Sequence, residues 1–189
     1  MTELEKKLLL SAEEYQYLFD RFCKEKTPTK QVNYYFDTED FEMNHKNITC
    51  RIRFKDGCYK GTVKQHKSDS DRSLETEIQV RDGIYDNAFI DMGLKFKGQL
   101  VTERVIIFKD LFCEVVLDKN DYLGCTDYEL EVEYCLQYEE EASAIYKEFL
   151  DMFKYRRCVG LFKDKPIYKK ATSKSKRFFA RMLSKCVDG

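Results

Sequence analysis

Apolar and polar residues alternate along most of the chain, which is the pattern of β-strands whose two faces meet different surroundings. We predict strands over residues 2–10, 30–38, 47–56, 58–66, 73–81, 98–109, 111–119 and 126–136. The connections between them are short, as at Lys55-Asp56-Gly57, and short connections favour antiparallel neighbours. Eight such strands are enough to close a small barrel.

Helical spacing interrupts this pattern. Ser11 and Glu14 have the spacing of a capping box in front of an apolar stripe, and a second helix is predicted over about 137–153. A short helix is predicted near 85–92 and a last one near 173–186. Because the chain contains two prolines and neither repeats nor a linker, we expect one α+β domain over 1–189 that includes this C-terminal helix.

The charges nearly cancel, with 33 basic and 34 acidic residues and a formal net charge of −1. Bulk charge therefore does not recruit nucleic acid or a membrane surface, and we expect neither as a partner. The basic stretch between Lys163 and Lys185 could serve such contacts, but we interpret it as a helix packed on the barrel. The chain has no apolar run of membrane-spanning length and no secretory core, so we expect a cytoplasmic protein. For its assembly we expect a monomer or a homodimer.

The cysteines and histidines limit the kinds of functional site that the chain can form. Eight cysteines are scattered without CxxC spacing, which favours reduced thiols over a disulfide framework. His45 and His66 are the two histidines, so a zinc site or a histidine-based catalytic system is poorly supplied. We interpret the polar stretch 66–72 as a hairpin tip.

Most predicted strands carry charge of mainly one sign on one face, because residues i, i+2 and i+4 share a face. The rows are Glu3, Glu5 and Lys7; Arg51, Arg53 and Lys55; Lys60, Thr62 and Lys64; Glu75, Glu77 and Gln79; Thr102 and Arg104; Glu114 and Asp118; and Asp127, Glu129, Glu131 and Glu133. An ordinary solvated sheet face is the simple alternative. However, the apolar stripes of the helices need the apolar strand faces as partners, and the charged faces would then point into the barrel.

Such an interior has a definite chemistry. Clustered carboxylates without histidine or cysteine suit hard cations such as Mg²⁺ or Mn²⁺, and rows of Arg and Lys suit phosphate oxygens. Together they describe a site for a metal-bound polyphosphate, where cations stabilise charge on a transferred phosphoryl group.

A set of motifs in order along the chain resembles the CYTH family, also called triphosphate tunnel metalloenzymes, and in particular its small bacterial triphosphatase-like members. Glu3-Leu-Glu-Lys-Lys7 matches the ExExK signature that opens the family. The further matching segments are Asn33-Tyr-Tyr-Phe-Asp37, Cys50-Arg-Ile-Arg53, Gly61-Thr-Val-Lys64, Glu75-Thr-Glu77, Glu103-Arg104, Leu117-Asp118, Asp127-Tyr-Glu-Leu-Glu-Val-Glu133 and the SKxxR-like Ser173-Lys-Ser-Lys-Arg177. The resemblance covers nearly the whole chain.

The resemblance implies an eight-stranded antiparallel tunnel that binds a triphosphate-containing small molecule and Mg²⁺ or Mn²⁺. By motif, the metal-side carboxylates would be Glu3, Glu5, Glu77, Glu129 and Glu131, and the phosphate ligands Lys7, Arg51, Arg53, Lys64, Arg104 and Lys174. Glu5, Glu131 and Lys7 would be catalytic, with Asp118, Glu75 and Glu133 in supporting positions. Thr102 departs from the family because many members have a second basic residue there, which leaves the preferred length of the phosphate chain open.

Three functions are compatible with these residues. The first is metal-dependent hydrolysis of inorganic tripolyphosphate or a small organic triphosphate, in which Glu5 or Glu131 assists a metal-polarised water. The second is an adenylate cyclase of the CYTH type, which would need an adenine pocket that the sequence does not identify. The third is a module that binds polyphosphate or a nucleotide without turnover.

Overall fold

Eight antiparallel strands close a barrel in the order β1-β10-β9-β8-β2-β3-β4-β5 in the computed structural model, which describes residues 2–66, 72–164 and 172–187. The strands are β1 (Thr2–Leu10), β2 (Thr29–Asp37), β3 (Ile48–Lys55), β4 (Cys58–His66), β5 (Arg72–Ile78), β8 (Lys95–Lys109), β9 (Cys113–Tyr122) and β10 (Cys125–Tyr134). The predicted α+β class and eight-stranded antiparallel barrel are confirmed.

One predicted strand is divided. The segment 73–81 leaves the barrel after Ile78, and β6 (Val80–Asp82) pairs instead with β7 (Asp86–Asn87) in a separate two-stranded sheet. Gly61 lies opposite Ile78 at the last pair of the barrel ladder, where a Cβ on residue 61 would lie 2.6 Å from the Ile78 carbonyl oxygen. The strand therefore turns away at a point where the two backbones approach closely.

The helices are α1 (Ala12–Phe22), α2 (Glu42–His45), α3 (Ala88–Asp91), α4 (Glu139–Cys158) and α5 (Lys174–Val187), with a 3₁₀ turn η1 (Leu136–Tyr138). The capping box at Ser11 and Glu14 is present. The helix predicted to end near 153 continues to Cys158, and Gly160 follows with a left-handed φ of +76°. In the described ranges no helix is long and apolar enough to cross a membrane.

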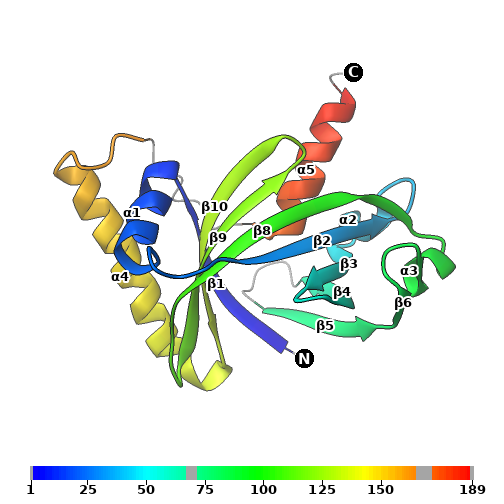
Figure 1. Ribbon diagram of the computed structural model, residues 1–189, viewed down its shortest axis with the longest axis horizontal. Helices are drawn as coiled ribbons and strands as arrows, with labels where there is room; N and C mark the ends of the chain where they lie inside the picture. The colour runs from blue at the N-terminus through cyan, green and yellow to red at the C-terminus, as the bar shows by residue number, and fades with distance from the viewer. Residues whose placement is uncertain (1, 67–71, 165–171, 188–189) are drawn as a thin grey trace.

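Helices α1 and α4 lie together against one side of the barrel (Figure 1). Alternating residues of β1, β8, β9 and β10 turn their apolar side chains outward to meet them, and Leu8, Leu18, Leu130 and Phe153 belong to this core. Because successive strand residues point to opposite faces, the same strands turn their charged rows inward. The barrel interior is therefore polar because the apolar faces of the strands are used to pack against the helices.

Helix α5 covers one end of the barrel interior. Its Phe178 and Phe179 are buried against Tyr35, Leu100 and Tyr122, which come from β2, β8 and β9. A Cβ on Gly98, whose φ is +141°, would lie 2.9 Å from the Phe178 ring. Glycine at this position lets the ring pack closely on the β8 backbone, and this packing holds the N-terminus of α5 next to the charged interior.

Candidate functional site

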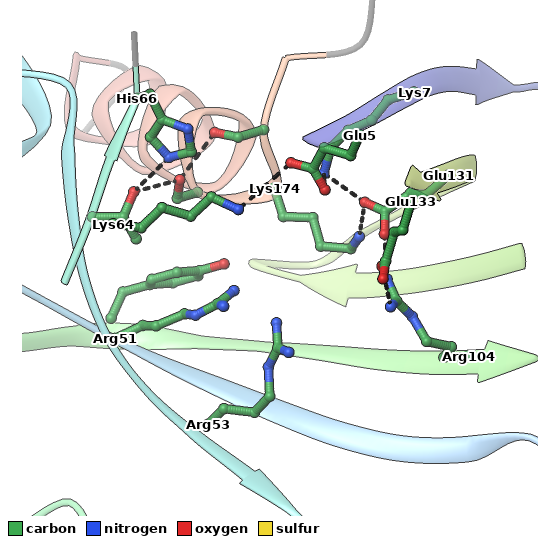
Figure 2. A pocket seen from close by; sticks show the side chains of 14 residues that line it. Glu5, Lys7, Arg51, Arg53, Lys64, His66, Arg104, Glu131, Glu133 and Lys174 are labelled. Carbon is green, nitrogen blue, oxygen red and sulfur yellow. Dashed lines mark hydrogen bonds and ion pairs between the residues drawn. The ribbon is translucent and has the colours of Figure 1, made fainter. Parts of the chain in front are cut away.

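The inward-facing charged side chains meet in one pocket inside the barrel (Figure 2). Its lining consists of Glu5, Lys7, Tyr35, Thr49, Arg51, Arg53, Lys64, His66, Arg104, Glu131, Glu133, Ser173, Lys174 and Ser175. Residues from β1, β2, β3, β4, β8 and β10 therefore share the pocket with the first turn of α5.

Strands β3 and β4 supply a cationic wall, which we define as Arg51, Arg53 and Lys64. The guanidinium groups of Arg51 and Arg53 point into the pocket (Figure 2). Arg51 donates to Thr62 at 3.0 Å and to Glu75 at 3.1 Å, and Arg53 donates to the Asn33 amide oxygen at 2.9 Å.

The cationic wall lowers the pKa of Glu75, its partner on β5. Lys64 lies 3.5 Å from Glu75 and 3.5 Å from Glu5. Burial tends to raise the pKa of Glu75, but Arg51 and Lys64 hold it below its usual value. Because this wall is largely removed from water, its cations would interact strongly with an anion that enters the pocket.

Strands β9 and β10 supply the opposite, carboxylate wall. Asp118, Glu129 and Glu131, which we call the carboxylate trio, are buried, and one oxygen of each lies within 4.8 Å of the others. Glu129 and Glu131 are two residues apart on β10, while Asp118 is the register partner of Glu129 on β9. The strand alternation thus brings three carboxylates to one point.

Cations from three different elements contact this trio. Lys7 donates to Glu131 at 2.5 Å and lies 3.0 Å from Glu5. Arg104 donates to both oxygens of Asp118, at 2.8 and 2.7 Å, and also contacts Glu131 and Glu133. These contacts, with those of Lys174, join the trio, Glu5 and Glu133 into one ion-pair network.

Lys174 of α5 reaches the centre of the trio. Its ammonium nitrogen lies 2.8 Å from Asp118, 2.8 Å from Glu131 and in contact with Glu129. Burial works against its charge, but the three carboxylates raise the pKa of Lys174 above its usual value. It is therefore an ammonium ion at neutral pH.

The two β10 glutamates differ in their electrostatics. Burial raises the pKa of Glu131, but Lys174, Lys7 and Arg104 outweigh it and hold that pKa well below the usual value. Burial raises the pKa of Glu129 and outweighs the effect of Lys174. Glu131 is thus the firmly ionised member of the pair, and Glu129 is the member that accepts a proton more readily.

Of the five predicted metal ligands, Glu129 and Glu131 belong to the trio. Glu5 lies in the pocket beside Lys7 but outside the trio, and two others are not placed there either. Glu77 shares the inward face of β5 with Glu75, but its side chain is 75% exposed and pairs with Lys60. It lies two residues further along the strand than Glu75, at a position that water reaches. Glu3 lies on β1, and its side chain is outside the described residues.

Sequence reasoning missed Arg177 as a site residue. Arg177 donates to both oxygens of Asp127, at 2.7 and 3.2 Å, and to Glu129 at 2.6 Å. Asn120 also donates to Asp127, at 3.0 Å, and accepts from Thr102 at 2.7 Å. Arg177 belongs to the SKxxR-like segment and is three residues after Lys174, so both lie on one side of a helix. This spacing could have identified Arg177 as a site residue from the sequence.

His66 was also missed, because the sequence placed it in a hairpin tip. It is the last residue of β4 and lines the pocket, with a ring nitrogen 3.3 Å from the Thr49 hydroxyl. Thr49 donates to Ser175 at 2.8 Å, and Ser175 lies 3.0 Å from Ser173. Residues 67–71 of the predicted tip lie outside the described residues, and Arg72 begins β5.

This placement predicts an acid-sensitive contribution of His66 to stability. Burial, aided by Lys64, lowers the pKa of His66 to about 4. As the pH falls from about 6.5 towards 4, the unfolded chain binds a proton that the folded protein does not, so stability is lost on acidification. We expect the drop in melting temperature between pH 7 and pH 5 to be smaller in His66→Gln. His45→Gln is the matched control, and equal drops in wild type and His66→Gln would contradict the prediction.

Comparison with known proteins assigns the fold to a family. The model of the CYTH domain matches residues 1–156. The chain belongs to the CYTH family. The match ends before α5, so the helix that carries Lys174 and Arg177 lies beyond the matched segment.

Relatives of this CYTH protein carry two kinds of names. "Putative triphosphatase YjbK" of Bacillus subtilis is 30% identical over 146 residues, which is 69% of this chain and 76% of the relative. A crystal structure of a "putative adenylate cyclase" from Bacillus halodurans has a TM-score of 0.68 at 27% identity and covers 94% of this chain and 97% of its own. HpAC1 from Hippeastrum, described as a "putative adenylyl cyclase" with a dominant triphosphatase activity, has a TM-score of 0.66 at 18% identity, with 97% and 96% covered.

Proposed function

We propose that this CYTH protein is a metal-dependent triphosphatase that hydrolyses inorganic tripolyphosphate or a small organic triphosphate. The observation that carries the proposal is the pairing of a cationic wall with a carboxylate trio across one buried pocket. Burying so many charged side chains costs free energy, and a ligand that carries both positive and negative charge would offset that cost. A metal–triphosphate complex is such a ligand.

The cationic wall would hold the phosphate chain. Arg51 and Arg53 offer planar groups that can donate two hydrogen bonds each to phosphate oxygens, and Lys64 adds a point charge beside them. Lys7, Arg104 and Lys174 extend the cationic surface across the pocket towards the trio. Charge on the transferred phosphoryl group would therefore be opposed from several directions.

The trio fits a divalent cation. Its three ligand oxygens lie within 4.8 Å of one another, and an all-carboxylate set suits Mg²⁺ or Mn²⁺. When bound, the metal would supply Lewis acidity towards the phosphate oxygens and towards water. Glu5 faces the same pocket and with Glu131 is the proposed acceptor of the proton of the attacking water, while Lys7 bridges and orients these two carboxylates.

The pocket favours hydrolysis over cyclisation. In the described part of the chain, its lining contains one aromatic side chain other than His66, Tyr35, whose ring packs against Phe178. A nucleoside base would therefore have little apolar surface to stack on, whereas phosphate finds cations throughout. The names of YjbK and HpAC1 support the same choice. We further propose that the whole chain is one domain, because α5 completes this pocket, and that the protein is cytoplasmic.

We expect hydrolysis to depend on added divalent metal and to stop in excess chelator. The test incubates the protein with Mg²⁺ or Mn²⁺ and tripolyphosphate, ATP or thiamine triphosphate, and measures released phosphate and cyclic AMP. Phosphate release from at least one substrate is the expected result. Cyclic AMP without phosphate would indicate a cyclase, and ligand that is bound but unchanged would indicate a binding module. Full turnover in excess chelator would refute the metal-dependent mechanism.

A further inference from the structure

The ammonium group of Lys174 lies among the three carboxylates that would hold the proposed metal. It contacts all three carboxylates, at 2.8 Å for Asp118 and 2.8 Å for Glu131, with Glu129 as the third contact. The Lys174 side chain is 11% exposed, and those of Asp118 and Glu129 are 0% exposed. This is a fully formed internal ion site occupied by a side chain of the same protein.

One cation fits between these carboxylates, and two do not. The Lys174 ammonium nitrogen already contacts an oxygen of each carboxylate, and a metal shared by the three would have to lie between the same side chains. A divalent ion and an ammonium ion at such a separation would repel each other strongly in a buried setting. Metal binding to the trio therefore requires that the Lys174 side chain leave it.

We propose that Lys174 is the resting occupant of the metal position and that it makes metal binding to the trio depend on triphosphate. This inference rests on the proposed function of the pocket. A triphosphate on the cationic wall would give the Lys174 ammonium another anionic partner within the same pocket, which both Lys174 and that wall line. Each ligand would then favour the other, because coupling between two sites is reciprocal.

The anchoring of α5 makes this exchange local. Arg177 holds Asp127 and Glu129 with hydrogen bonds of 2.6 to 3.2 Å, and Phe178 and Phe179 are buried in the end of the barrel. Lys174 is the first residue of the helix and has a long flexible side chain. Its ammonium group can therefore swing away while the rest of α5 stays in place.

The test measures binding of Mn²⁺ alone by titration calorimetry, without triphosphate. If Lys174 occupies the site, the apparent affinity for Mn²⁺ equals the intrinsic affinity multiplied by the fraction of molecules in which the site is free. We expect Lys174→Met to bind Mn²⁺ roughly tenfold or more tightly than wild type. Lys174→Arg, which keeps the charge, should stay near the wild-type affinity. Arg181→Gln, an exposed charge removed from the same helix, should also match wild type.

Thermal unfolding gives a second readout. Lys174→Met leaves the trio without its central cation, so the metal-free variant should melt below wild type, and added Mn²⁺ should raise its melting temperature more than that of wild type. If Lys174→Met does not fold, amine labelling of wild type takes its place: Lys174 should resist acetylation without metal and become several-fold more reactive in saturating Mn²⁺.

Two results would overturn the inference. One is an equal Mn²⁺ affinity of wild type and Lys174→Met, and the other is unchanged labelling of Lys174 in wild type saturated with Mn²⁺. Failure of the proposed function is a separate outcome, since it would appear as wild-type protein that binds Mn²⁺ but releases no phosphate from any triphosphate.

Discussion

Replacing Glu131 by glutamine is expected to reduce triphosphate turnover by on the order of a hundredfold or more. Glu131 belongs to the carboxylate trio and is contacted by Lys7, Arg104 and Lys174 at once. Glutamine keeps the shape but removes the charge on which the proposed metal site depends. The measurement is kcat as a function of metal concentration, and the variant should need more metal as well as turn over more slowly.

The same substitution should lower stability. The folded-state pKa of Glu131 lies well below its usual value, because Lys174, Lys7 and Arg104 outweigh the effect of burial. Such a carboxylate contributes stability above its unfolded pKa and loses it as the pH falls towards the folded pKa. Glutamine cannot make this contribution, so the variant should melt below wild type at pH 7.

Glu103→Gln is the matched control for both readouts. Glu103 lies on β8 and pairs with Lys119, and its side chain is 42% exposed. An exposed ion pair of this kind contributes little to stability, so the control should retain wild-type turnover and melting temperature. Wild-type kinetics in Glu131→Gln would remove this residue, and with it most of the proposed metal site, from the mechanism.

Replacing Arg51 by glutamine should raise the KM for tripolyphosphate by roughly tenfold to a hundredfold, which corresponds to the loss of one or two charge-assisted hydrogen bonds. Arg51 lines the pocket and shares Glu75 with Lys64. Lys64 still neutralises Glu75 after the change, so the melting temperature should fall much less than substrate binding does. Steady-state kinetics with thermal unfolding of the ligand-free protein measure the two effects.

Arg81→Gln is the matched control for Arg51→Gln, because it removes the same kind of charge outside the pocket. Arg81 pairs with Asp91 at 2.5 Å, with its side chain 48% exposed, so its loss should leave KM unchanged. If Arg51→Gln unfolds the protein while KM in the remaining folded fraction stays at the wild-type value, Arg51 is a structural partner of Glu75 and does not bind phosphate.

Much of the fold follows from the alternation of residues along the chain. Leu8 and Leu130 must be buried, so their neighbours Lys7 and Glu129 must point to the opposite face, and the apolar stripes of α1 and α4 decide which face lies outside. The motif order identified the CYTH family on the same residues. Local signals also located the capping box at Ser11 and the turn at Asp56-Gly57.

The tertiary structure alone decided which charges meet. Periodicity places Glu75 and Glu77 on one face, but only the closed barrel shows that Glu75 faces Arg51 whereas Glu77 lies in water beside Lys60. The contact between Lys174 and Glu129 joins residues that are 45 positions apart in the sequence. Strand and helix periods specify the face on which a side chain lies. They do not specify its partner across the barrel, because that depends on closure, register and the way in which Phe178 and Phe179 seat α5.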